Sequence, residues 1–169
     1  AYLVKTKRMY KDKKVKQRTL KYLGRAFKLN NIGLKPDLAR FLNKDLSLFI
    51  DEASKKEVIL KLIEFELLNH GFNKLKNGIY RSNSDITIDF NKIKIRNTKN
   101  KLAVLEINEG FLCEYTINAL LNFKFPNLNE KECGKYLANA ILSTGIKLDE
   151  QLFIKLYDKF FKDVLSSTN

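Results

Sequence analysis

Residues 78–108 contain short runs in which apolar and polar side chains alternate, and this pattern constrains the fold more than any other feature of the chain. Ile86, Ile88 and Phe90 alternate with polar residues in one run, and Ile93 and Ile95 do so in the next. A period of two is typical of a strand that buries one face. We therefore expect an antiparallel four-stranded meander, with strands over residues 78–82, 85–90, 92–96 and 102–107.

Most of the remaining chain has helical patterns. Ser54 and Glu57 form a capping box before an apolar run with helical spacing, and Gly71 ends that run. Pro36 begins a short helix that ends near residue 42. Three more helices are predicted over residues 111–122, 130–143 behind an Asn129 cap, and 150–165 behind an Asp149 cap. We expect an α+β fold with the helices packed on one face of the sheet.

The amino-terminal segment has the pattern of a basic β-hairpin. Residues 2–10 and 15–23 are rich in β-branched and aromatic side chains, and the polar tetrad 11–14 separates them. We divide the chain into a hairpin appendage, residues 1–28, and an α+β domain, residues 29–169. Because two strands alone are marginally stable in water, we expect the hairpin to dock on the domain, join its sheet or order on a polyanion.

Positive charge is concentrated in two segments of the chain, which carries a formal net charge of +13 over 169 residues. Residues 1–28 hold 11 Lys and Arg against Asp12, and residues 74–101 hold eight against Asp85 and Asp89. The other segments are close to neutral and mostly helical. This distribution favours a basic binding face on strands, and an ordinary solvated surface is the alternative.

Such a face suits the phosphates of nucleic acid. Lys outnumbers Arg by 26 to 6, and lysine binds phosphate as a point charge, whereas recognition of guanine is mainly arginine chemistry. We predict a nucleic-acid-binding protein, not an enzyme, that contacts DNA or RNA with low sequence specificity and needs no cofactor or metal. Tyr10 and Tyr22 are predicted either to stack on bases of a single strand or to pack within the hairpin.

The predicted contact residues come from both basic segments. If Ile93 and Ile95 face the core, the period of two makes the cations beside them project together from the open face of the sheet. The full set is Lys5, Lys7, Arg8, Tyr10, Lys13, Lys14, Lys16, Arg18, Lys21, Tyr22, Arg25, Lys92, Lys94 and Arg96.

The run KTKRMYKDKKVKQRTLKYLG, residues 5–24, resembles the amino-terminal segment of certain insertion-sequence transposases. In those proteins a basic hairpin leads into a phrase similar to residues 15–24. The resemblance covers residues 2–24, about a seventh of the chain. Such transposases continue into a larger RNase H-like catalytic domain, and nothing after Gly24 matches it. The resemblance therefore implies a DNA-contacting appendage and does not imply transposition.

Two alternatives remain for the function. Glu64 on a helix, Asp89 at a strand end and Glu106 on a later strand resemble the layout of PD-(D/E)XK nucleases, in which carboxylates hold Mg²⁺. The pattern departs from that family at Asn108, where the family has lysine, and Lys94 would have to supply the missing amine. The other alternative is a basic scaffold that docks an acidic protein or ribosomal RNA.

The sequence offers few other candidates for a catalytic, metal-binding or phosphate-binding site. The single histidine, His70, lies where a helix ends and suits a cap. Cys113 and Cys133 suit buried apolar positions, and no phosphate-binding glycine loop is present. No apolar run is long enough to cross a bilayer, so we expect a cytosolic protein. An aromatic stripe in residues 153–164 is predicted to pack within the domain, and a homodimer interface is the alternative.

Overall fold

The computed structural model describes residues 1–9, 14–33, 37–125 and 129–166, with side chains for residues 1–6, 15–33, 37–125, 129 and 131–161. The predicted α+β class is confirmed. In chain order the elements are β1 (Tyr2–Met9), β2 (Lys14–Tyr22), β3 (Arg25–Lys28), α1 (Leu38–Leu42), α2 (Leu46–Glu52), α3 (Lys55–Asn69), β4 (Phe72–Lys76), β5 (Ile79–Ser82), β6 (Thr87–Asp89), β7 (Lys94–Arg96), β8 (Ala103–Ile107), β9 (Gly110–Leu112), α4 (Glu114–Leu121), α5 (Glu130–Ser143) and α6 (Glu150–Ser166).

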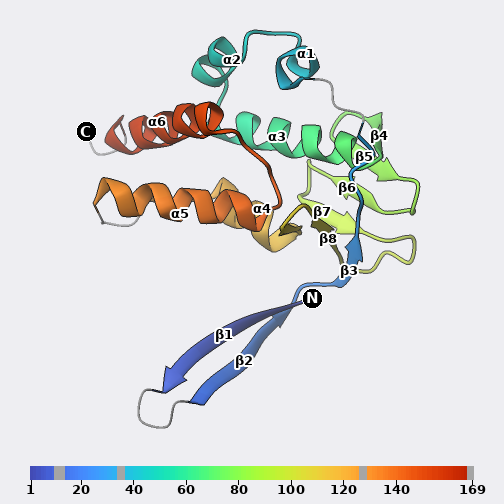
Figure 1. The fold of residues 1–169 in the computed structure, drawn as a ribbon. Helices are drawn as coiled ribbons and strands as arrows, with labels where there is room; N and C mark the ends of the chain where they lie inside the picture. The colour runs from blue at the N-terminus through green and yellow to red at the C-terminus, as the bar shows by residue number, and fades with distance from the viewer. Residues whose placement is uncertain (10–13, 34–36, 126–128, 167–169) are drawn as a thin grey trace.

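The described strands form three sheets. Strands β4 to β7 make an antiparallel four-stranded meander in chain order, and β1 pairs with β2 as the predicted hairpin. A third sheet has β8 in the middle, parallel to β3 and antiparallel to β9. Figure 1 shows the meander at one end of the molecule with the helices on one side of it. Its outer face is therefore left open to solvent.

The meander differs from the predicted one at both of its ends. Its first strand is β4, which was not predicted, because Phe72 is the one buried residue in a strand of otherwise exposed side chains. The strand predicted over residues 102–107 forms as β8, but its place in the meander was wrong. All residues of β8 except Glu106 are buried, because β8 is the central strand between β3 and β9. A single bridge between Arg96 and Leu102 links β7 to the chain just before β8.

Helix boundaries follow local capping in most places. Ser54 accepts a hydrogen bond from the Glu57 N–H at 3.2 Å, and Asn129 accepts one from the Glu132 N–H at 3.0 Å. Asp149 caps α6 in the same way, as predicted. The helix predicted over residues 111–122 begins later, at Glu114, because residues 110–112 pair with β8 as strand β9.

The core joins α3 to the inner face of the meander. Tyr80, Ile88 and Ile95 stand side by side across β5, β6 and β7 and are at most 2% exposed. Ile63 of α3 belongs to the same buried cluster. Phe90 is also buried and contacts Tyr80, with ring centroids 5.3 Å apart, so its predicted core position is confirmed.

Tyr80 is expected to make the stability of the protein depend on pH under alkaline conditions. Burial, a hydrogen bond to Glu64 and the charge of Glu64 all raise the pKa of Tyr80 above its ordinary value of 10.0. Above pH 10 the unfolded chain releases this proton while the folded protein keeps it, so stability falls by up to about 1.4 kcal/mol per pH unit. We expect chemical unfolding to show a steeper loss in the wild type than in Tyr80→Phe. Equal slopes would contradict this expectation.

The cysteine, aromatic and histidine side chains of the helical part lie where they were predicted. Cys113 and Cys133 are buried and form no disulfide. Phe160 is buried, and Tyr157 contacts Phe125 with ring centroids 5.5 Å apart, so the described part of the aromatic stripe packs within the domain as predicted. His70 caps α3, with its ring Nδ1 2.8 Å from the carbonyl oxygen of Glu66. Among the described helices, none is long and apolar enough to span a membrane.

Candidate nucleic-acid interface

The hairpin of β1 and β2 projects from the body of the molecule and is attached at its root (Figure 1). There the Leu23 N–H donates to the carbonyl oxygen of Ala1 at 3.0 Å, and the Arg25 N–H donates to that of Leu102 at 3.1 Å. Gly24 has φ +139°, and a Cβ on it would lie 2.7 Å from the Leu102 oxygen. Glycine is therefore required where the chain passes from the hairpin into β3.

The register of the hairpin gathers cations on one face. Lys5 stands opposite Arg18, and Lys16 shares their face because side chains alternate along a strand. Lys21 pairs with Leu3 beyond a β-bulge and lies on the same face. All of these cationic side chains are exposed, and no described acid lies within ion-pair distance of them. We call Lys5, Lys16, Arg18 and Lys21 the basic face of the hairpin.

The other predicted hairpin contacts lie toward its tip. Outside the described residues are Tyr10 and Lys13, whereas the backbone alone is described for Lys7, Arg8 and Lys14. The backbone register places Lys7 opposite Lys16. A second pair of basic residues therefore stands directly across the hairpin, next to the pair of Lys5 and Arg18.

The opposite face of the hairpin is uncovered and carries both apolar and polar side chains, the polar ones including Thr6, Gln17 and Thr19. Tyr2 and Tyr22 pair across the strands with ring centroids 5.2 Å apart, and they are 62% and 50% exposed. Val4 and Val15 share this face and are also exposed. Tyr22 thus contacts Tyr2 and keeps half of its surface open. Because this face and the basic face point in opposite directions, base stacking on Tyr22 and phosphate contact by the basic face would use different sides of the hairpin.

A second basic surface lies on the outer face of the meander. Arg81, Thr87 and Arg96 stand in one row across β5, β6 and β7, and Lys94 stands in the next row beside Asp89. These residues line an open hollow of about 700 Å³. The hollow also contains Lys92 and the polar side chains of Asn97, Thr98 and Asn100. Lys92, Lys94 and Arg96 therefore come together as predicted.

Lys92 reaches this hollow from the turn before β7, not from the strand in which it was predicted. The strand was expected to begin at Lys92, but Asp89 accepts hydrogen bonds from the N–H groups of Asn91 and Lys92, which makes a turn there. Ile93 then adopts a left-handed conformation with φ +50°. A β-branched residue is strained in this region by roughly 1–2 kcal/mol, and the packing of Ile93 against the core holds it.

Acidic neighbours neutralise part of the charge in the hollow. Arg81 forms an ion pair with Asp85 at 2.7 Å, and Arg96 lies 3.2 Å from Glu114. Lys92 and Lys94 have no such partner among the described residues. The hollow therefore offers two ammonium groups that form no ion pair with a described residue, surrounded by hydroxyl and amide donors and by the carboxylates of Asp85 and Asp89. The two ammonium groups suit an anionic oxygen group such as phosphate.

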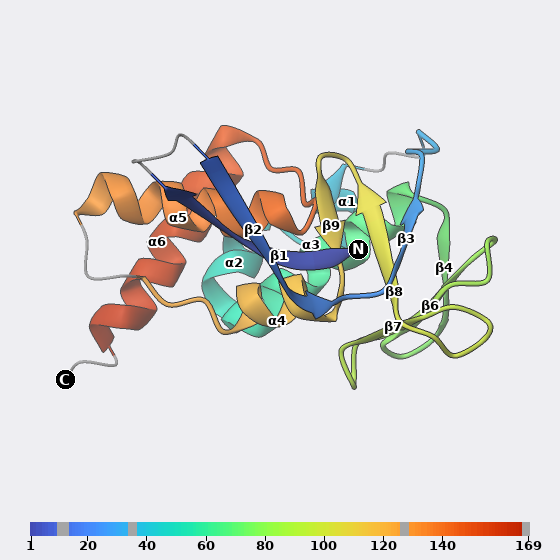
Figure 2. The same cartoon turned by 90° about the horizontal axis from the view of Figure 1, so that it is seen from below.

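The two basic surfaces are separate. Figures 1 and 2 both show the hairpin running away from the meander, beneath the helical body. Arg25, predicted as a hairpin contact, lies on β3, and its guanidinium carbon is 5.4 Å from the centroid of the Phe27 ring. The structure thus divides the predicted contact residues between a projecting hairpin, the start of β3 and a sheet face.

The three carboxylates of the nuclease alternative occupy different surroundings. Glu64 is buried on the inner side of the meander and pairs with Lys61 at 2.8 Å. Asp89 faces the outer hollow, and Glu106 on β8 lies 3.8 Å from Lys28. Among the described residues, no group of three or more histidine, cysteine or acidic side chains is arranged to hold a metal ion. The geometry does not bring the predicted acids to one site.

Arg81 was absent from the predicted contacts although it lines the hollow. Its position next to Tyr80 in an alternating strand was a usable signal, because a buried Tyr80 requires Arg81 to face outward.

Comparisons with protein-family models, curated proteins and solved structures find no match to this chain. The resemblance of residues 2–24 to transposases therefore stays a prediction, and functional inference rests on the residues themselves.

Proposed function

We propose that this chain binds nucleic acid in the cytosol through the basic face of its projecting hairpin, mainly by contacts to phosphates. The observation that carries the proposal is the register of β1 and β2, which places Lys5 opposite Arg18 and Lys7 opposite Lys16. Like charges directly across a strand pair destabilise it by roughly 0.2–1 kcal/mol each. The hairpin projects without support from the body and is therefore only marginally stable, so the repulsion between these cations matters. A polyanion bound along this face would replace that repulsion with attraction between the cations and the phosphates.

The hollow on the meander supplies a second contact for a long polyanion. Lys92 and Lys94 form no ion pair with a described residue. They stand beside the polar side chains of Thr87, Asn97 and Thr98, and no aromatic ring is among the described residues that line the hollow. Such a surface suits phosphate rather than base recognition. The resemblance of residues 2–24 to transposase segments favours DNA as the ligand of the hairpin. A two-stranded ribbon also fits the major groove of double-stranded DNA.

Charge reversal on the basic face tests the proposal. Lys16→Glu/Arg18→Glu places carboxylates opposite Lys7 and Lys5, so it should strengthen the hairpin while removing phosphate contacts. We expect mobility-shift affinity for duplex DNA near 0.1 M salt to fall by roughly tenfold to a hundredfold. The slope of log affinity against log salt should become shallower by about two.

The matched control carries the same change in net charge on the helical body. Lys131→Glu/Lys135→Glu alters two exposed lysines on α5, and we expect it to retain most of the affinity. Circular dichroism and limited proteolysis would report whether the hairpin is intact in each variant. Equal losses of affinity in the two variants would mean that the change in net charge alone explains the loss. Unchanged affinity in the hairpin variant would contradict the proposal.

A further inference from the structure

Two tyrosine rings stand together on the hairpin, next to its root and on the face opposite the basic face (Figure 1). Tyr2 pairs with Tyr22 across β1 and β2, with ring centroids 5.2 Å apart and an interplanar angle of 54°. The two residues are 62% and 50% exposed. In each of the other ring pairs that the structure describes, both rings are buried or half-buried. Only in this described pair are both rings open to a ligand.

The surroundings of the two rings favour a nucleic acid base over an apolar protein surface. Protein partners are marked by a contiguous apolar patch, whereas here the polar side chains of Thr6, Gln17 and Thr19 follow Val4 on the same face. Residues 1–9 and 14–22 contain no acid, so a ligand of this face lies close to uncompensated positive charge. An unpaired base brings a flat ring and a phosphate together, and it stacks on aromatic side chains with little sequence preference.

The opposite orientation of rings and cations indicates the form of the nucleic acid. Inside an intact duplex the faces of the bases are covered by their neighbours, and a protein reaches them only when a base leaves the stack. A continuous duplex along the basic face therefore leaves both tyrosine rings without a ligand. Nucleotides beyond the end of a duplex are free to turn round the edge of β2. Lys21 is exposed, lies on the basic face and directly precedes Tyr22, so it marks the place of this turn.

We propose that the hairpin recognises duplex nucleic acid that ends in an unpaired strand, and that Tyr2 and Tyr22 stack on the unpaired bases. The phosphates of the duplex lie along the basic face, and Lys21 contacts the phosphate at which the strand turns round the hairpin. This inference rests on the proposed function, because it requires the basic face to bind phosphates. It adds the class of ligand, in which overhanging or forked ends are preferred to continuous duplex.

Two ligands with equal numbers of phosphates test the stacking. One duplex carries a short unpaired overhang with its bases, and the other carries the same overhang built from abasic sugar and phosphate. We expect the full chain to bind the overhang with bases about tenfold more tightly in a mobility-shift competition, because one stacked base is enough for this factor. Equal affinity for the two ligands would overturn the proposal, since charge alone would then explain the binding.

The variant Tyr2→Val/Tyr22→Val removes both rings and keeps residues that favour strands. We expect the ratio of its affinities for the two ligands to fall to about one. The matched control, Tyr115→Ala/Tyr136→Ala, removes two exposed tyrosines from α4 and α5 and should keep the wild-type ratio. A wild-type ratio in the hairpin variant, or an equal loss in the control, would contradict stacking on Tyr2 and Tyr22.

Crosslinking of the wild type gives a readout that does not depend on the folding of a variant. With 5-iodouracil in the overhang, ultraviolet light should crosslink the strand to Tyr2 or Tyr22, as mapped by mass spectrometry. If Tyr2→Val/Tyr22→Val loses the hairpin, this crosslink decides, and a crosslink to neither tyrosine would overturn the proposal. Binding that Lys16→Glu/Arg18→Glu leaves unchanged contradicts the proposed function, whereas hairpin-dependent binding with a ratio of one contradicts this inference alone.

Discussion

Gly110→Ala is expected to destabilise the protein by more than about 3 kcal/mol, and thermal unfolding should shift down by at least 6 °C or so. A Cβ on Gly110 would lie 2.2 Å from the carbonyl oxygen of Leu142 and 2.2 Å from the nitrogen of Gly145. Both neighbours are backbone atoms at the end of α5, so no side-chain rotation relieves the contact. Strand β9 and helix α5 would have to move apart, which opens the core on which sheet β3-β8-β9 packs.

Gly134→Ala is the control for this prediction. Gly134 lies within α5, and the nearest atom to an added Cβ is 3.9 Å away on Tyr157. Alanine is favoured over glycine inside a helix by roughly 0.5–1 kcal/mol. Urea unfolding should therefore show opposite signs for the two substitutions. A Gly110→Ala protein as stable as the wild type would mean that β9 does not pack against the end of α5 in this way.

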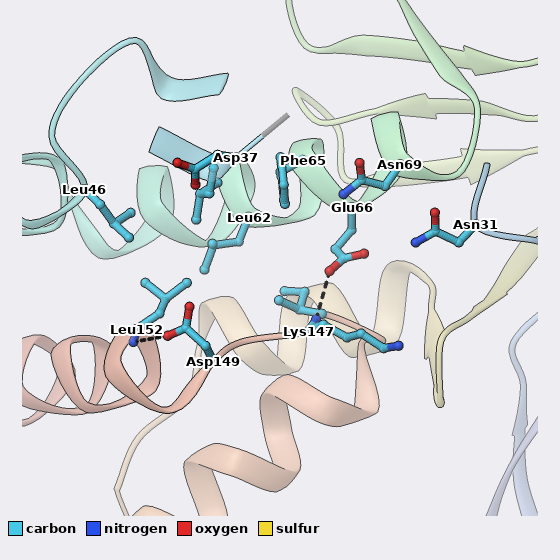
Figure 3. A pocket seen from close by; sticks show the side chains of 12 residues that line it. Asn31, Asp37, Leu46, Leu62, Phe65, Glu66, Asn69, Lys147, Asp149 and Leu152 are labelled. Carbon is cyan, nitrogen blue, oxygen red and sulfur yellow. Dashed lines mark hydrogen bonds between the residues drawn. The ribbon is translucent and has the colours of Figure 1, made fainter. Parts of the chain in front are cut away.

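Glu66→Ala is expected to reduce the free energy of unfolding by roughly 3 kcal/mol. Glu66 is 5% exposed and joins three parts of the chain, because it lies on α3 and accepts hydrogen bonds from Asn108 after β8 and from Lys147 before α6. Without the Glu66 carboxylate the Lys147 N–H has no described acceptor (Figure 3), whereas the Asn108 amide keeps its hydrogen bond to the carbonyl oxygen of Gly145. The Lys147 N–H and the Asn108 amide would lose partners that are far away in sequence.

Two further variants separate this network from a simple loss of charge. Glu66→Gln should be milder than Glu66→Ala, because an amide oxygen still accepts from the Lys147 N–H. Glu109→Ala removes an exposed acid near Asn108 and should change stability by less than about 0.5 kcal/mol. Chemical unfolding of the three variants checks the order, and equal stability of Glu66→Ala and Glu109→Ala would contradict it.

Local signals in the sequence predicted much of the fold. The caps at Ser54, Asn129 and Asp149 form as expected, because a cap depends on residues three positions apart. The alternation of Ile86, Ile88 and Ile95 with polar residues correctly assigned the buried side of the meander, because the period of two belongs to the strand itself.

Predictions that depended on distant partners were less complete. The strand over residues 102–107 was assigned to the meander because it follows the meander in sequence, whereas it pairs with Arg25–Lys28 and with Gly110–Leu112. Strand β4 carries a single buried residue, Phe72, so its membership of the meander depends on pairing with β5 and has little trace in its own pattern.

The candidate sites show the same division. The concentration of cations in residues 1–28 and 74–101 is a property of the sequence, and so is the grouping of Lys92, Lys94 and Arg96 within a few positions. The separation of the two basic surfaces and the like-charged register of the hairpin came from the structure alone. The hairpin register depends on how β1 pairs with β2, including the bulge between Leu3 and Val4. The separation of the two surfaces depends on contacts between residues far apart in the chain, which form because burial of the shared core brings those segments together, and no local pattern encodes that choice.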